Sequence, residues 1–118
     1  LVGSEMCIRD RLEGRPLVHT NHTVLPEACA VEGQLDPAVL SNSVRRMERA
    51  NELLDQPVVT VDDLMEATRD SEAICRTSMP PRHVESSGAV VMRPATREFW
   101  AVWGLPLHND YMNVPFLD

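Results

Sequence analysis

SSGAVVMRPATREFWAVWG, residues 86–104, contains the strongest strand signal in the chain. Two apolar runs rich in β-forming residues, 86–93 and 97–104, flank Pro94-Ala95-Thr96. Two such runs separated by a short turn-forming segment are typical of a β-hairpin. Trp100 and Trp103 are three residues apart and so fall on opposite faces of the second strand. We expect one of them to pack into a core and the other to face a neighbouring layer or a partner.

Two helices are predicted before the hairpin. In residues 37–54 the apolar side chains recur at helical spacing, Asp36 is a suitable N-cap, and Pro37 suits the first helical position. In residues 61–70 the cap is Thr60, with Asp63 three residues later as an aspartate version of the capping box. The expected stripe of the first helix is Leu40, Val44, Met47, Asn51 and Leu54.

The remaining segments are shorter. Residues 15–20, RPLVHT, are typical of a strand, and Asn21-His22-Thr23 lies at its end. Residues 71–83 form a turn-rich connector, and Pro106 and Pro115 predict an irregular C-terminal tail. The order strand, helix, helix, two strands, tail predicts an α+β fold with antiparallel strands rather than a parallel βαβ arrangement.

Composition restricts the function. The 118 residues carry a net charge of −7, which argues against a nucleic-acid partner because phosphate contacts need clustered basic residues. All 11 basic residues are arginine, so Schiff-base catalysis and a P-loop lysine are excluded within this chain. No apolar run is long enough to span a bilayer, and we expect no membrane partner. The three cysteines form no CxxC pair.

A few polar residues are candidates for chemistry. Asn21 could donate its amide to an oxyanion, although spacing alone favours an asparagine that caps a loop. His19 and His22 with a cysteine could bind a metal, but hydrogen-bonded or surface histidines are the commoner case. The basic run of the first helix could bind a carboxylate or phosphate, or it could form a solvated face paired with Glu48 and Glu52. This run is Arg45, Arg46 and Arg49.

The first eleven residues, LVGSEMCIRDR, resemble the translation of a transposase-type sequencing adapter. We therefore expect residues 1–11 to be foreign to the protein and residues 12–118 to be the C-terminal fragment of a larger domain. Cys7, which would otherwise be a candidate nucleophile near an N-terminus, belongs to this foreign stretch.

Four stretches of the chain carry a resemblance: VHTNHTVLPE (18–27), SNSVRRMERANELL (41–54), TVDDLMEATRDSEAICR (60–76) and SSGAVVMRPATREFWAVWGLPLHNDY (86–111). In order, they contain a strand ending in Thr-Asn-His, a Ser-x-x-Arg helix, an Ile-Cys-Arg connector and a terminal hairpin. This series resembles the penicillin acyltransferase-like family, the relatives of acyl-coenzyme A:6-aminopenicillanic acid acyltransferase among the N-terminal-nucleophile hydrolases. Ser71, Thr77 and Leu107 depart from residues that are frequent in the family, which indicates a divergent subfamily.

The resemblance implies half of an αββα N-terminal-nucleophile hydrolase sandwich. It implies a cysteine amidohydrolase or acyltransferase acting on linear amide or thioester acyl groups through an acyl-enzyme. Asn21 matches the oxyanion donor, and Arg46 is the expected substrate-side arginine, with Arg45 as the alternative alignment. Cys29 and Cys75 do not match the nucleophile, which is expected in a missing N-terminal half of the same protein.

The partners implied are a small-molecule amide or acyl substrate and that missing half. No cofactor and no metal are expected, and acyl-coenzyme A would be a substrate. The alternative is a non-enzymatic binding or scaffold domain that uses the same sandwich, and a small metal-binding module ranks third.

Overall fold

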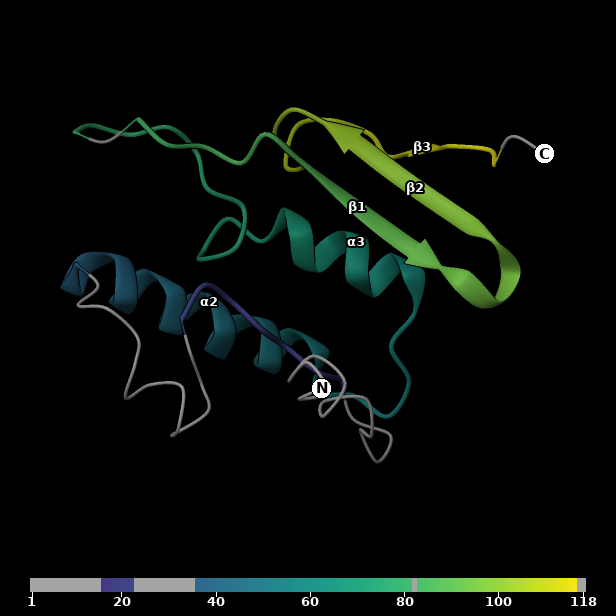
Figure 1. Ribbon diagram of the computed structural model, residues 1–118, viewed down its shortest axis with the longest axis horizontal. Helices are drawn as coiled ribbons and strands as arrows, with labels where there is room; N and C mark the ends of the chain where they lie inside the picture. The colour runs from purple at the N-terminus through teal and green to yellow at the C-terminus, as the bar shows by residue number, and fades with distance from the viewer. Residues whose placement is uncertain (1–15, 23–35, 82, 117–118) are drawn as a thin grey trace, which may run out of the picture. The chain divides into compact units, whose positions relative to one another are not determined.

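The computed structural model describes residues 16–22, 36–81 and 83–116 (Figure 1). The chain divides into two compact units, Leu1–Val58 and Val59–Asp118, which are described separately. The predicted boundary between residues 11 and 12 lies outside the described residues, as do Cys7 and Cys29.

Helix α2, Pro37–Leu54, forms the centre of the first unit. It begins as predicted, because the Asp36 carboxylate accepts a hydrogen bond from the amide of Ala38 at 2.8 Å and proline occupies the first turn. Leu54 is buried as expected, but Leu40 is 40% exposed and Asn51 is exposed. The buried face of α2 is therefore narrower than the predicted stripe.

The predicted strand at residues 15–20 is wrong for the part that the structure describes. Residues 16–20 pair with no strand, and the chain bends at Asn21 and His22. β-propensity describes how well a side chain fits a sheet, but a strand forms only where another strand offers backbone groups to pair with. In this unit the segment is bonded instead to α2, through Thr20 and His22.

Helix α3, Val61–Arg69, opens the second unit with the predicted capping box. The Thr60 hydroxyl accepts a hydrogen bond from the amide of Asp63 at 3.2 Å, and the Asp63 carboxylate accepts one from the amide of Thr60 at 2.8 Å. Two amides that would otherwise lack partners at the helix start are thereby satisfied. Ala67 is buried, and the other predicted core residues of this helix, Leu64, Met65 and Thr68, are half-buried.

The predicted hairpin is confirmed by β1 (Gly88–Arg93) and β2 (Glu98–Trp103), and a third strand, β3 (Met112–Asn113), extends it into an antiparallel sheet of order β1-β2-β3. Arg97 has a positive φ of 55° where the chain enters β2. The C-terminal tail is less irregular than predicted, because β3 pairs beside Trp100 and Ala101 of β2. The 3-10 turn η2 (Pro94–Thr96) joins the two strands of the hairpin.

The two faces of the sheet differ sharply in burial. Val91 and Val102 lie on the face that packs against α3, and they are 4% and 3% exposed. Paired residues of antiparallel strands share a face, so the register assigns a second set of side chains to the opposite side. We call this the outer sheet face: Val90, Met92, Phe99, Ala101, Trp103 and Met112.

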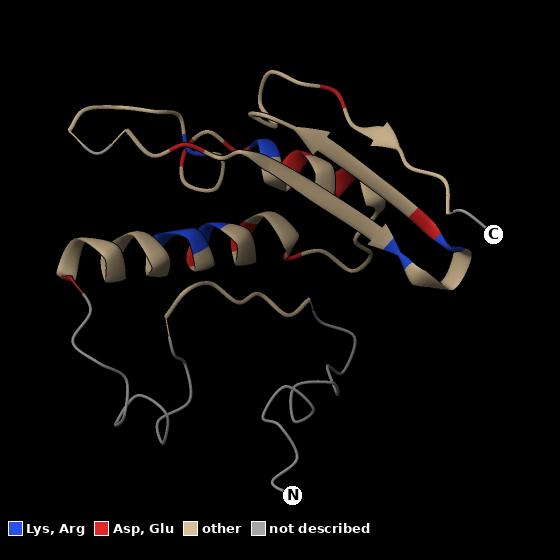
Figure 2. Cartoon of the chain, turned by 45° about the horizontal axis from the view of Figure 1, so that its top comes forward, with Lys and Arg blue, Asp and Glu red and all other residues tan. Residues whose placement is uncertain are grey.

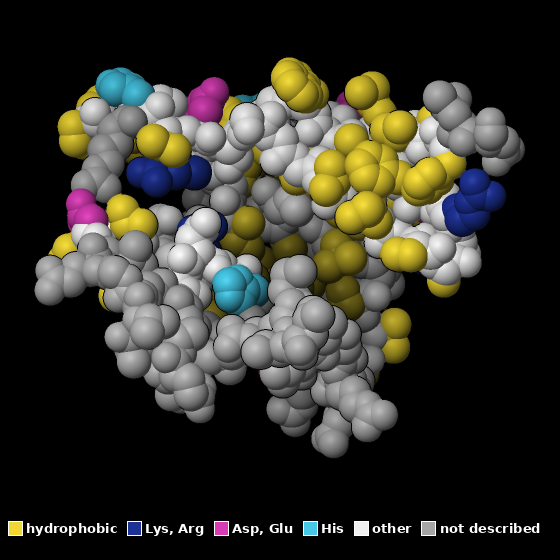
Figure 3. Space-filling model, in the orientation of Figure 1, with side chains coloured by type: hydrophobic (Ala, Val, Ile, Leu, Met, Phe, Trp, Pro, Cys, Tyr) yellow, Lys and Arg dark blue, Asp and Glu magenta, His cyan; other side chains and the backbone are white. Residues whose placement is uncertain are grey.

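The outer sheet face is apolar and largely exposed. Trp103 is 87% exposed and Met92 57%. Figure 3 shows hydrophobic side chains gathered over the sheet, and Figure 2 shows that charge on β1 and β2 is confined to the hairpin end, where Arg93 and Glu98 lie. The prediction that the two tryptophans lie on opposite faces is confirmed, because Trp100 pairs with Val91 and Trp103 with Gly88.

The described residues therefore form an α+β fold with two α-helices and a three-stranded antiparallel sheet. None of the helices in the described part of the chain is both long enough and apolar enough to cross a membrane.

Candidate functional site

The segment Thr20–His22 is anchored on the middle of α2 by a group of polar contacts. The Thr20 hydroxyl donates to the backbone carbonyl of Ser43 at 2.9 Å, and the Ser43 hydroxyl lies 3.0 Å from Thr20 Oγ1. Nδ1 of His22 lies 2.9 Å from Ser43 Oγ and 3.1 Å from Thr20 Oγ1. We call Thr20, His22 and Ser43 the Ser43 clamp.

Two of the three clamp residues, His22 and Ser43, are buried, and Thr20 is half-buried. Ser43 is 1% exposed and His22 is 7% exposed, which are unusual values for polar side chains. Buried polar groups destabilise a fold unless they find hydrogen-bond partners. No buried side-chain nitrogen or oxygen in the described residues lacks one. The clamp thus ties the segment to the helix without leaving a desolvated polar atom unpaired.

Asn21 lies between the two clamped residues, and its side chain meets Arg46. Nη2 of Arg46 donates to Oδ1 of Asn21 at 2.7 Å, and Nε of the same guanidinium donates to Oδ1 of Asn42 at 3.1 Å. Arg46 follows Ser43 by three residues, which places both on neighbouring turns of one helix face. Two sets of contacts from α2 therefore determine where the Asn21 amide lies.

The structure thus brings together Asn21 and Arg46, the two residues singled out for a site. Arg45, the alternative alignment, is exposed, and among the described residues the guanidinium bonded to Asn21 is that of Arg46. Arg49 forms an ion pair with Glu52 at 3.3 Å, as expected for a solvated helix face. The basic run of α2 is therefore divided between the Asn21 site and the surface, and Figure 2 shows its position on the helix.

The metal-binding alternative finds no support in the described residues, where no three histidine, cysteine or acidic side chains are grouped to hold an ion. His22 is occupied by the Ser43 clamp, and His19 is exposed. Cys29, the cysteine nearest to both histidines in sequence, lies outside the described residues.

Sequence analysis gave Ser43 and Thr20 no role of their own, although they lie in the Ser-x-x-Arg and Thr-Asn-His stretches. A signal for Ser43 was present, because Leu40, Ser43, Met47, Ala50 and Leu54 follow the three-and-four spacing of a buried helix face. A small polar residue at such a position indicates a buried hydrogen bond with a partner from elsewhere in the chain. The identity of that partner is a tertiary property, since 23 residues separate Thr20 from Ser43.

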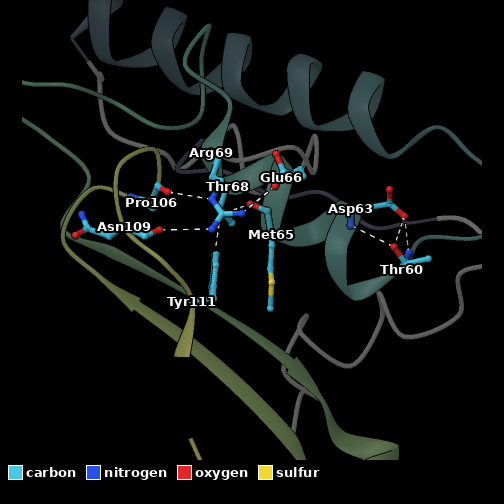
Figure 4. Close-up of polar contacts among 9 residues, drawn as sticks. All are labelled: Thr60, Asp63, Met65, Glu66, Thr68, Arg69, Pro106, Asn109 and Tyr111. Carbon is cyan, nitrogen blue, oxygen red and sulfur yellow. Dashed lines mark hydrogen bonds and ion pairs between the residues drawn. The ribbon is translucent and has the colours of Figure 1, made fainter. Parts of the chain in front are cut away.

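The second unit contains a separate group of polar contacts around Arg69 (Figure 4). Nε of Arg69 donates to the carbonyl of Pro106 at 3.1 Å, and its guanidinium carbon lies 5.3 Å from the ring centre of Tyr111. The hydroxyls of Tyr111 and Thr68 are 2.7 Å apart. These contacts hold the chain between β2 and β3 against α3, and they indicate a structural role.

Cys75 also belongs to the second unit. It is 3% exposed, as expected for a cysteine that acts as a small buried hydrophobe. A nucleophile must reach its substrate, so burial argues against Cys75 in that role.

One carboxylate has a perturbed acidity. Hydrogen bonds from Thr96 and Arg93 lower the pKa of Glu98 below its usual range. Arg93 Nε donates to Glu98 Oε2 at 2.6 Å at the hairpin end. This ion pair joins the end of β1 to the start of β2 and so supports the turn of the hairpin. It belongs to the second unit and is not part of the Asn21 site.

Comparison with known proteins identifies no relative: no family model, curated protein or solved structure matches this chain.

Proposed function

We propose that this chain contributes the oxyanion-binding part of an N-terminal-nucleophile cysteine amidohydrolase or acyltransferase. The substrate would be a linear amide or a thioester acyl compound, processed through an acyl-enzyme. The observation that carries the proposal is the hydrogen bond from Arg46 to Asn21. The resemblance of the Thr-Asn-His and Ser-x-x-Arg stretches to the penicillin acyltransferase-like family supports the same assignment.

The orientation of the Asn21 amide follows from the chemistry of its partner. A guanidinium has only N–H donors, so the atom of Asn21 that faces Arg46 is the oxygen. The Nδ2 group then points away from Arg46, with two hydrogens to donate. Asn21 is exposed, and no acceptor is bonded to Nδ2 among the described residues. An oriented amide donor that remains available is what an oxyanion site requires.

The positive charge behind the amide strengthens this role. A hydrogen bond from a cation to the amide oxygen polarises the amide and makes its N–H groups better donors. Negative charge that develops on a carbonyl oxygen during nucleophilic attack would be stabilised by Nδ2 directly and by Arg46 at longer range. Neither contribution needs a rearrangement at the moment of reaction, because α2 already holds both groups.

In the proposed reaction a cysteine thiolate adds to the substrate carbonyl, and the carbonyl electron pair moves onto the oxygen that Asn21 binds. Collapse of this intermediate expels an amine or a thiol and leaves a thioester on the enzyme. Water or an acceptor amine then releases the acyl group by the same two steps. The cysteine and its α-amine, acting as base, would come from the N-terminal half of the protein.

The outer sheet face supports the sandwich architecture that accompanies this function. Two sheets of a sandwich pack through apolar inner faces, and α-helices cover the outside. In the second unit α3 covers one face of the sheet, and the other face is apolar and exposed. We propose that a second sheet of the complete protein covers the outer sheet face.

The test uses the complete reading frame, with Asn21→Asp as the decisive variant. Aspartate still accepts a hydrogen bond from Arg46, but it has no amide hydrogen to donate at neutral pH. We expect the rate of amide or thioester turnover to fall about 100- to 1,000-fold, as is usual when an oxyanion donor is removed. Asn42→Asp is the matched control, because it makes the same change in the other partner of Arg46.

Equal loss of activity in the two variants would count against an oxyanion role for Asn21. A complete protein that neither turns over amides or thioesters nor reacts with an acyl-enzyme-forming thiol probe would favour the binding or scaffold alternative. Cysteine-dependent turnover by these 118 residues alone would show that the nucleophile is not missing.

A further inference from the structure

The proposed reaction gives no direct role to the Ser43 clamp. Its hydrogen-bond donors and acceptors can be assigned by counting the hydrogens that each group carries. The Thr20 hydroxyl has one hydrogen, which it donates to the Ser43 carbonyl at 2.9 Å. The Ser43 hydroxyl has one hydrogen and two neighbours, Thr20 Oγ1 at 3.0 Å and His22 Nδ1 at 2.9 Å. Only the protonation of Nδ1 determines which neighbour receives it.

If Nδ1 of His22 carries a hydrogen, every contact in the clamp is a hydrogen bond. Ser43 then donates to Thr20, and Nδ1 donates to the oxygens of Ser43 and Thr20, at 2.9 and 3.1 Å. If Nδ1 carries no hydrogen, Ser43 donates to it. No hydrogen then lies between Thr20 Oγ1 and Ser43 Oγ, or between Thr20 Oγ1 and Nδ1. Both contacts bring two lone pairs close together. In a buried site such unpaired contacts are costly.

We infer that the Ser43 clamp holds neutral His22 as its Nδ1–H tautomer and that Thr20, His22 and Ser43 are positioning residues for Asn21. This inference rests on the proposed function for the role of Asn21, whereas the tautomer is inferred from the contacts of Nδ1 in the clamp. In a neutral histidine, the hydrogen bonds that the ring makes determine which of its two nitrogens carries the proton. Nε2 of His22 is then left as an acceptor.

The positioning role follows from where the clamp attaches. The residues before and after Asn21 are both bonded to Ser43, so the backbone of Asn21 is fixed on each side. Arg46 lies about one turn further along α2 and meets the Asn21 side chain. A single helix face thus holds the backbone of the donor residue through Ser43 and its amide through Arg46.

The tautomer can be measured on the 118-residue chain by long-range ¹H–¹⁵N correlation of ¹⁵N-labelled histidines. The pH should lie well above the range in which histidine takes up a proton, and His22→Gln identifies the His22 signals. We expect the Nδ1–H pattern for wild-type His22. Thr20→Val removes the acceptor of the Ser43 hydrogen, so Ser43 should donate to Nδ1 and His22 should change to the Nε2–H pattern.

Two variants serve as controls. Thr20→Ser keeps the hydroxyl and should retain the Nδ1–H pattern and the wild-type signals of the Asn21 side-chain amide. Ser41→Ala alters an exposed serine on the same helix and should change neither. Thr20→Val should move the Asn21 amide signals, because the segment loses its attachment to the Ser43 carbonyl.

An Nε2–H pattern for wild-type His22 would overturn the inference, whether or not Thr20→Val folds. Asn21 amide signals that are identical in Thr20→Val and Thr20→Ser would overturn the positioning role. The proposed function can fail separately. If His22 carries its proton on Nδ1 but the complete protein keeps its activity in Asn21→Asp, the tautomer inference stands and the proposed function is refuted.

Discussion

Arg46 donates a hydrogen bond to Asn21 at 2.7 Å across 25 residues of sequence, and the same guanidinium donates to Asn42. Arg46→Lys tests this bridge, because one ammonium group cannot reproduce the planar fork that reaches two amides at once. In the complete protein we expect up to about a 100-fold loss of turnover through misorientation of Asn21. Arg45→Lys should leave the rate unchanged, and an equal effect of the two substitutions in a steady-state assay would contradict the bridge.

Removing the hydroxyl of Tyr111 should weaken the second unit. Tyr111→Phe loses the 2.7 Å hydrogen bond with Thr68 but keeps the ring beneath Arg69, so we expect about 0.5–1.5 kcal/mol of lost stability. Tyr111→Leu should cost about 0.5–1 kcal/mol more, because it also removes the cation–π contact. Denaturant unfolding followed by tryptophan fluorescence reports on this unit, which contains both tryptophans. A Phe variant as stable as wild type would show that the hydroxyl pair contributes nothing.

The hairpin should lose stability in acid through Glu98. Hydrogen bonds from Thr96 and Arg93 lower the pKa of this carboxyl in the folded state. A lowered folded-state pKa contributes stability above the pKa of the unfolded chain, and that contribution is lost as the pH falls through the folded-state value. Glu98→Gln should therefore reduce stability at neutral pH and flatten its dependence on pH in the acidic range. An unchanged acid profile in unfolding experiments from neutral to low pH would refute this assignment.

The outer sheet face should drive association of the 118-residue chain at high concentration. Exposed apolar patches on a sheet tend to associate, and Trp103 and Met92 form part of this one. The double variant Met92→Thr and Trp103→Thr keeps residues that suit strands and should lower the sedimentation coefficient at high concentration. Val58→Thr is the control, because Val58 is 74% exposed but lies outside the sheet. A wild-type chain that remains monomeric throughout would count against the prediction.

Most of the second unit could be predicted from sequence because its determinants are local. The capping box joins residues three apart, and the hairpin joins two runs across a short turn. Strand β3 was missed because two residues carry no periodic signal. It forms by pairing with β2, and it is flanked by a backbone hydrogen bond from Val114 to Phe99 and by the contact of Tyr111 with Thr68, 43 residues away.

The sequence by itself determined where α2 and α3 begin, the hairpin, and Asn21 and Arg46 as candidate site residues. Caps, turns and helical periodicity act over a few residues, so they are encoded where they occur. Only the tertiary structure decided that residues 16–20 are bonded to a helix rather than to a strand, and that Ser43 anchors both neighbours of Asn21. Those contacts join residues more than 20 positions apart, and buried polar groups find such partners only when the chain has folded.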